Sequence, residues 1–339
     1  MRLFSKKAPP QNETIAEFWQ WWNTARDDVA KAVNDGTLVG LGKEIERRVH
    51  AVDPGLSWEV RRSSTSAHVL AVTPRYPANV RAAAERWLAA APPADETWSY
   101  RSVLVVADPE ALESTREHGG HVVDLAETRY CITVREQDRQ IDVVCWHPAF
   151  EGLPEDAREH FAYHAIDWAL GEDDAVVWTD EITWTAAEPA KSCSPAEFRE
   201  AVSALAGRAD HWKLWSGNWN GSTFRTVVAA PLHPERWPRF DQHVLIRLPY
   251  RRFDDEQLPV DESLTALRRF EEKLSEAAGA DGALVAHETV DGRRTLHFYV
   301  DSQTGALAEL ESRLPQWREG QASVDTLLDP MFQRVEYLQ

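Results

Sequence analysis

Residues 282–301 read GALVAHETVDGRRTLHFYVD, and this stretch decides the fold of the last third of the chain. Its Asp291-Gly292 dipeptide is typical of the two-residue turns that join paired strands. A turn there sets three cross-strand pairs on one face of an antiparallel hairpin. The pairs are Glu288 with Thr295, Ala286 with His297 and Leu284 with Tyr299. The sequence therefore predicts a hairpin with a polar patch on one face.

Upstream of this hairpin, a strand expected at 244–248 leads through a proline-containing connection into a charged helix. The connection contains Pro249, Phe253 and Leu258-Pro259. Prolines in such a segment punctuate regular structure and favour a loop between the strand and the helix.

This block resembles a bacterial family known only as domain of unknown function 695, over about residues 240–339. The resemblance is carried by Leu258-Pro259, Phe270-Glu271, Asp291-Gly292-Arg293-Arg294, Phe298-Tyr299, Asp329-Pro330-Met331-Phe332 and Tyr337-Leu338. The family tends to have Trp near Phe332, so the terminal match is imperfect. The family is similar in turn to regulators of the ribonuclease E inhibitor protein B type. The resemblance implies a fold and a protein-binding precedent, and no catalytic residue.

The rest of the chain is long enough for a second domain, because a chain of 339 residues exceeds the usual size of one core. Thr14-Ile15-Ala16-Glu17 has the form of a capping box, so residues 1–13 are expected to be loose and residues 14–187 to form a domain. Residues 188–193 are expected to be a linker. Ser194-Pro195-Ala196-Glu197 then starts a helix that opens a C-terminal domain at 194–339.

Strand hairpins alternate with helices in both halves. Residues 144–156 and 244–261 each run from a strand through Pro, Phe and Leu-Pro to Asp and a helix. This pattern predicts an α+β fold of two modules, each a mostly antiparallel sheet with helices packed on one face, of ferredoxin-like type. Internal duplication is a hypothesis raised by the same pattern.

The net charge of −18 bounds the choice of partner. Nucleic-acid binding needs clustered Lys and Arg, and anionic membranes repel an acidic chain. We therefore expect no nucleic acid and no membrane, and a basic protein partner is compatible; solubility alone is the alternative. Without a long apolar run or a secretory start, a cytoplasmic location is expected.

Four side chains with metal-ligand chemistry lie on one stripe of the helix expected at 154–170. They are Asp156, His160, His164 and Asp167. Two imidazoles one turn apart, with carboxylates, have the ligand chemistry of a divalent-metal site. The alternative is a solvated face whose carboxylates support the helix. No other cofactor is predicted.

A second candidate site lies on the hairpin face that carries Glu288, His297 and Tyr299. Glu288 is diagonal to His297, within reach of long side chains. A carboxylate that orients an imidazole beside a phenol can perform acid–base chemistry. The alternative is a half-covered structural face whose polar tips are hydrogen-bonded.

Tryptophan is abundant, at 15 residues. The candidate partner-binding tryptophans are Trp21, Trp212, Trp215 and Trp219, since exposed Trp is enriched at interface hot spots. Trp215 and Trp219 share one face of a hairpin turned on Asn220-Gly221, and Trp212 lies on the other. At least one face is therefore expected to be core.

Together these features favour a non-enzymatic protein-binding or regulatory module with an acidic surface. The alternative is a metal-dependent enzyme using the Asp156 stripe, or an acid–base enzyme using the Glu288 face. No phosphate-binding loop, dinucleotide fingerprint or nucleophile elbow occurs in the sequence.

Overall fold

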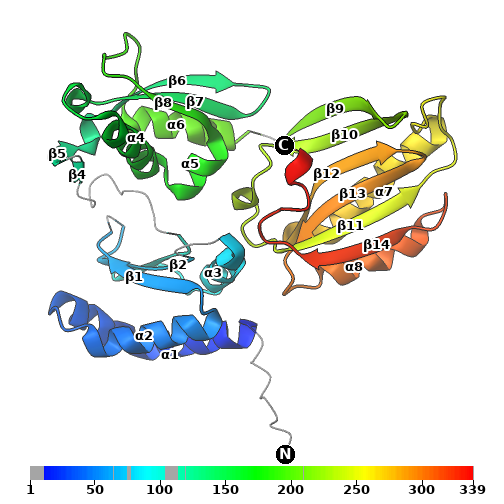
Figure 1. Cartoon of the computed structure of the whole chain (residues 1–339). Helices are drawn as coiled ribbons and strands as arrows, with labels where there is room; N and C mark the ends of the chain where they lie inside the picture. Colours follow the sequence, from blue (N-terminus) through cyan, green and yellow to red (C-terminus); the bar gives the residue numbers. More distant parts are fainter. Residues whose placement is uncertain are drawn as a thin grey trace, which may run out of the picture. The chain divides into compact units, whose positions relative to one another are not determined.

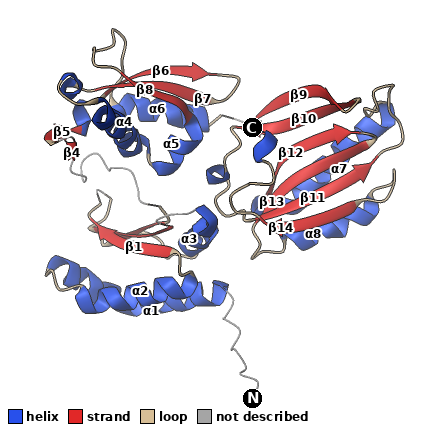
Figure 2. Cartoon of the chain, in the orientation of Figure 1, coloured by secondary structure: helices blue, strands red, loops and turns tan. Residues whose placement is uncertain are grey.

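The computed structural model describes residues 11–63, 65–74, 78–103, 114–118, 120–208 and 210–338. The chain divides into two compact units, Met1–Leu112 and Glu113–Gln339. Both mix helices with sheets, so the predicted α+β class is confirmed (Figures 1 and 2). Among the described helices, none combines the length and the apolar character needed to cross a membrane.

The first unit packs helices against a three-stranded sheet. Its elements are α1 (Gln11–Asn34), α2 (Val39–Val52), β1 (Leu56–Arg61), β2 (His68–Pro74), α3 (Arg81–Ala89) and β3 (Trp98–Arg101). The strand order is β1-β2-β3, with β3 parallel to β2. The start of α1 differs from the expected cap at Thr14. The helix already includes Gln11, whose carbonyl accepts the Thr14 hydroxyl at 2.8 Å, so Thr14 lies within the first turn.

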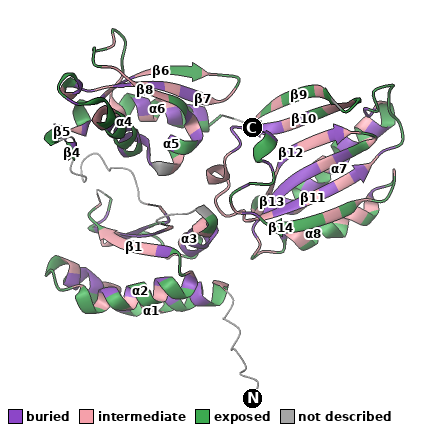
Figure 3. Cartoon of the chain, in the orientation of Figure 1, coloured by how far each residue is buried: buried purple, intermediate pink, exposed green. Residues whose placement is uncertain are grey.

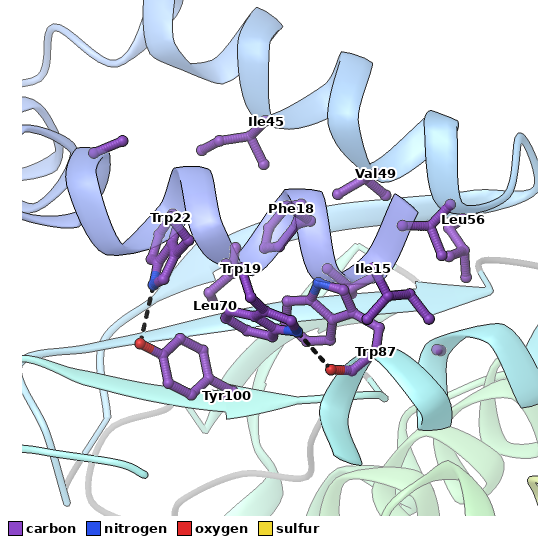
Figure 4. Packing of buried hydrophobic residues seen from close by; sticks show 14 of the residues in the cluster. Ile15, Phe18, Trp19, Trp22, Ile45, Val49, Leu56, Leu70, Trp87 and Tyr100 are labelled. Atoms are coloured by element: carbon purple, nitrogen blue, oxygen red, sulfur yellow. Dashed lines mark hydrogen bonds between the residues drawn. The ribbon is translucent and has the colours of Figure 1, made fainter. Parts of the chain in front are cut away.

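An aromatic cluster forms the core of the first unit (Figure 4). The side chains of Phe18, Trp19 and Trp22 enter it from α1 and are buried. The Trp22 indole N–H donates to the Tyr100 hydroxyl at 2.9 Å, and that of Trp19 donates to the Trp87 carbonyl at 2.9 Å. These bonds satisfy polar groups that would otherwise be costly to bury.

The second unit begins with two small sheets. Its first elements are β4 (Thr115–His118), β5 (His121–Asp124), β6 (Arg129–Arg135), β7 (Gln140–Trp146), α4 (Glu155–Leu170), α5 (Glu172–Trp178), β8 (Thr179–Trp184) and α6 (Pro195–Ala206). The capping box that opens α6 is confirmed. However, α6 packs onto the preceding segment, since Arg199 donates to the Ala169 carbonyl at 2.8 Å and Cys193 pairs with Tyr130. The expected linker at 188–193 thus lies inside the second unit, and as a domain boundary it remains a prediction.

The second unit continues into a six-stranded antiparallel sheet of order β14-β11-β13-β12-β10-β9. The elements are β9 (His211–Trp219), β10 (Ser222–Ala230), β11 (Gln242–Pro249), α7 (Asp261–Ala278), β12 (Gly282–Val290), β13 (Arg293–Val300), α8 (Ala306–Arg313) and β14 (Ser323–Leu328). Helices α7 and α8 cover one face, where they pack on Val244, Leu296 and Phe298. On the opposite face Phe332 and Val335 of the C-terminal segment cover the middle of the sheet.

The internal repeat predicted from the sequence falls in sheets of different topology. Strand β7, before α4, has β6 and a parallel β8 as neighbours, whereas β11, before α7, lies between antiparallel β13 and β14. Duplication of one module therefore remains a hypothesis.

The register of the Asp291-Gly292 hairpin is confirmed near the turn. Glu288 pairs with Thr295 and Ala286 with His297. The expected pairing of Leu284 with Tyr299 is wrong, because a register shift between Leu284 and Ala286 places Ala283 opposite Tyr299. A bulge of this kind adds one residue to one strand and displaces every pair beyond it.

Candidate functional site

A pocket of about 660 Å³ opens on the sheet face opposite α7 and α8. Its walls come from β9, β10, β12 and the C-terminal segment. The lining residues are Trp215, Phe224, Thr226, Glu288, Val290, Tyr337 and Leu338. Its volume lies within the range of about 300–1,000 Å³ that is common for ligand sites.

The aromatic side of the pocket depends on a glycine. Gly217 of β9 lies opposite Phe224 of β10, and Trp215 lies opposite Thr226 on the same face. A Cβ atom on Gly217 would lie 2.8 Å from two atoms of the Phe224 ring. The missing side chain therefore leaves room for the Phe224 ring over Gly217.

Glu288 supplies the carboxylate in the pocket wall. Its side chain is 26% exposed, and its Oε2 atom accepts the Tyr337 hydroxyl at 2.7 Å and pairs with His297 Nε2 at 3.0 Å. Among the described residues, none donates a hydrogen bond to Glu288 Oε1. The protein thus holds one oxygen of this carboxylate through two side chains.

Behind Glu288 a second imidazole continues the network. His243 Nε2 lies 3.2 Å from His297 Nδ1, and both residues are buried. The His243 Nε2–H can donate to His297 Nδ1 while the His297 Nε2–H donates to Glu288, and this proton arrangement satisfies the chain. The network therefore orients the carboxylate from behind.

Tyr299 does not join this network, contrary to the sequence-based hypothesis. Its hydroxyl donates to Asp329 Oδ2 at 2.6 Å, and its ring stacks on Phe332 with centroids 3.6 Å apart. Asp329 also accepts the backbone N–H groups of Gln333 and Arg334. Tyr299 thus helps to fasten the C-terminal segment through its hydroxyl, while its ring lies 5.0 Å from that of His243.

The electrostatics of the site concentrate negative charge on Glu288. Burial raises the pKa of Glu288, but hydrogen bonds from His297 and Tyr337 outweigh this and hold that pKa below its ordinary value. Burial, and then the neighbouring His297, lower the pKa of His243 to about 4. Burial and the adjacent Glu288 raise the pKa of Tyr337. At neutral pH, Glu288 is therefore ionised, while His243 and Tyr337 are uncharged.

The predicted metal stripe gains one unexpected neighbour. The His160 and His164 rings lie 5.2 Å apart on α4, and the buried His118 of β4 lies 5.5 Å from each. Asp156 and Asp167 are exposed on the same helix. Within the described residues, no group of three or more His, Cys, Asp or Glu side chains could hold a metal ion. A divalent metal thus remains a prediction without support from the geometry.

The four candidate tryptophans fall in different environments. Trp215 is 44% exposed and lines the pocket, whereas Trp212 is 40% exposed on the opposite face of β9. Trp21 is half-buried, with the Arg48 guanidinium 4.7 Å from its ring centre. The side chain of Trp219 lies outside the described part of the structure. Trp215 is therefore the candidate that the fold brings to the pocket.

The site includes residues that sequence reasoning missed, notably His243, Phe224 and Tyr337. Tyr337 belongs to the terminal motif of the family resemblance, but nothing local connects it with Glu288. His243 lies on β11 opposite Tyr299, so finding it requires the order of the strands.

Residues 210–333 match DUF695, a family of unknown function. The match contains the whole six-stranded sheet and begins before the expected residue 240. No comparison supports the more remote similarity to the ribonuclease E inhibitor type. The chain has no significant match among the curated proteins or the solved structures.

Proposed function

We propose that the sheet at residues 210–338 is a protein-binding module that takes a basic side chain of a partner protein into the pocket beside Glu288. One observation carries this proposal: an ionised carboxylate stands in a pocket whose other walls are mainly aromatic and aliphatic. Carboxylates and aromatic faces attract ammonium and guanidinium groups. The apolar walls suit the aliphatic stem of Lys or Arg.

The charge of the whole chain supports the same class of partner. A net charge of −18 attracts a basic protein over long range and raises the rate of encounter at low salt. The pocket then supplies a short-range contact that plain acidity does not.

Acid–base catalysis is the second candidate, because the Glu288–His297 contact has the form of a catalytic pair. Two features favour recognition over catalysis. The lowered pKa of Glu288 makes it a weak base at neutral pH, whereas effective general bases have a pKa near the working pH. His297 is buried, and its Nε2 atom is already bonded to Glu288 Oε2. Neither His297 Nε2 nor Glu288 Oε2 is therefore offered to a substrate.

The proposal is tested with n-butylammonium as a probe for the lysine head group, titrated into the full-length protein and followed by ligand-observed NMR. We expect saturable binding that Glu288→Gln weakens about tenfold through loss of the charge. Trp215→Ala should weaken it as well. Glu272→Gln, which removes the same charge from the exposed face of α7, is the matched control and should bind like the wild type. Binding that is absent, or equal in Glu288→Gln, would sink the proposal.

A further inference from the structure

We infer that the partner's backbone adds as a strand to the outer edge of β9, so that the same partner segment pairs with this edge and fills the pocket. The inference rests on the proposed function and specifies its binding mode. Strand β9 is the last in the order of the six-stranded sheet, and Figure 3 shows that it is largely exposed. An unpaired edge of this kind is a template for strand addition.

The hairpin turn fixes which backbone groups face that edge. Asn220 and Gly221 have φ values of 51° and 87°, as in a two-residue turn of type I′. In such hairpins the flanking pair, here Trp219 with Ser222, is hydrogen-bonded, and bonded and non-bonded pairs then alternate. Leu214 and Ser216 therefore point their N–H and C=O groups away from β10. No described backbone group outside the sheet bonds to them.

Beyond Lys213, the β9 edge lacks the charged and proline residues that usually prevent strand addition. Residues 214–219 read LWSGNW, with no charged residue and no proline. Leu214 is 67% exposed, and Trp215 is exposed on the other face. The preceding Lys213 is charged: its Nζ is bound by Asp138 of the β6–β7 turn at 2.8 Å and lies 5.3 Å from the centre of the Trp215 ring. Natural edge strands are normally protected by charges, proline or bulges, so this stretch is suited to a partner.

The geometry of the edge and of the pocket together defines the partner segment. Trp215 and Gly217 face the pocket, and Leu214 and Ser216 face the other side. In an added antiparallel strand, residues opposite Trp215 send side chains toward Glu288, and their neighbours send side chains toward Leu214. The occupant is therefore an extended basic segment in which Lys or Arg alternates with apolar residues.

The test uses a fluorescent peptide of alternating Val and Lys, seven residues long, and its anisotropy with the full-length protein. In the antiparallel register, Val residues opposite Leu214 and Ser216 offer their N–H groups to β9, and Lys residues offer theirs to solvent. N-methylation of the Val residues should thus weaken binding at least about tenfold, while N-methylation of the Lys residues should have little effect. Equal binding of the two methylated peptides would overturn strand addition.

A protein variant gives an independent arm. Ser216→Pro removes a backbone N–H that points to the open edge. It removes no hydrogen bond between β9 and β10. We expect it to lose the peptide but to keep n-butylammonium, which also reports an intact pocket. Peptide binding unchanged in Ser216→Pro would count against the edge. If the wild type binds n-butylammonium but not the peptide, strand addition is refuted and the proposed pocket is retained. If the wild type binds the peptide but not n-butylammonium, the proposed pocket is refuted.

Discussion

Protonation of His243 should set part of the pH dependence of stability in the second unit. The residue is 5% exposed, and burial, followed by the neighbouring His297, lowers its pKa to about 4. A histidine in an unfolded chain titrates near about 6.5. Between about pH 4 and pH 6.5 the unfolded chain therefore binds a proton that the folded chain does not. The stability associated with neutral His243 is complete above about pH 6.5 and is lost as the pH falls toward 4.

The size of this effect follows from the separation of the two pKa values. The full difference is worth about 3 kcal/mol, of which about 2 kcal/mol is lost between about pH 7.5 and about pH 5. His243→Gln keeps an N–H donor for His297 Nδ1 but does not titrate. The free energy of unfolding of this variant should thus fall by about 2 kcal/mol less than that of the wild type over the same interval.

The assay is urea unfolding of the full chain at both pH values, followed by circular dichroism. His121→Gln is the control, because His121 is an exposed histidine on β5 of the same unit. We expect it to follow the wild-type pH dependence. If the free energies of the wild type and His243→Gln change in parallel, the reasoning about His243 is refuted.

Three further substitutions probe the packing described above. In the wild type the Arg294 guanidinium lies 2.7 Å from the nearly buried Glu271 carboxylate, and Arg294→Met leaves that carboxylate without this partner. The free energy of unfolding should fall by about 3 kcal/mol in urea titrations. Adding Glu271→Leu should restore most of that loss. Trp22→Phe removes a 2.9 Å bond to a buried hydroxyl and should lower the stability of the first unit by about 1–3 kcal/mol, with the transition of the second unit unchanged. Gly217→Ala must displace the Phe224 ring and should weaken n-butylammonium binding. The free energy of unfolding should change by less than about 2 kcal/mol, because Ala is favoured over Gly in a strand and this offsets part of the clash. Unaltered n-butylammonium affinity would contradict the role given to the Phe224 ring.

The hairpin at Asp291-Gly292 shows how far local rules reach. A two-residue turn fixes the pairs next to it, and the pairs of Glu288 and Ala286 were predicted correctly. The prediction failed at Leu284, beyond the bulge. A bulge reflects the packing of both faces of a strand, and a single sequence does not contain that information in local form.

The candidate site was predictable to the same extent. The contact of Glu288 with His297 is a diagonal pair within one hairpin, so spacing was sufficient to propose it. The contacts of His243 and Tyr337 depend on which strand lies beside β13 and on the return of the C-terminal segment across the sheet. Both are long-range features, which neither periodicity nor turn chemistry encodes.

The C-terminal segment shapes the sheet face on which we propose the cation site. Phe332 and Val335 pack on the middle of the face, where His243 and His297 are buried, whereas Glu288 lines the pocket. A carboxylate that is already oriented by His297 and Tyr337 need not reorganise when a ligand arrives, and such preorganisation favours binding. It also lowers the tendency of Glu288 to take up a proton, which opposes its use as a base. The same hydrogen bonds therefore favour recognition of a positive charge over proton transfer.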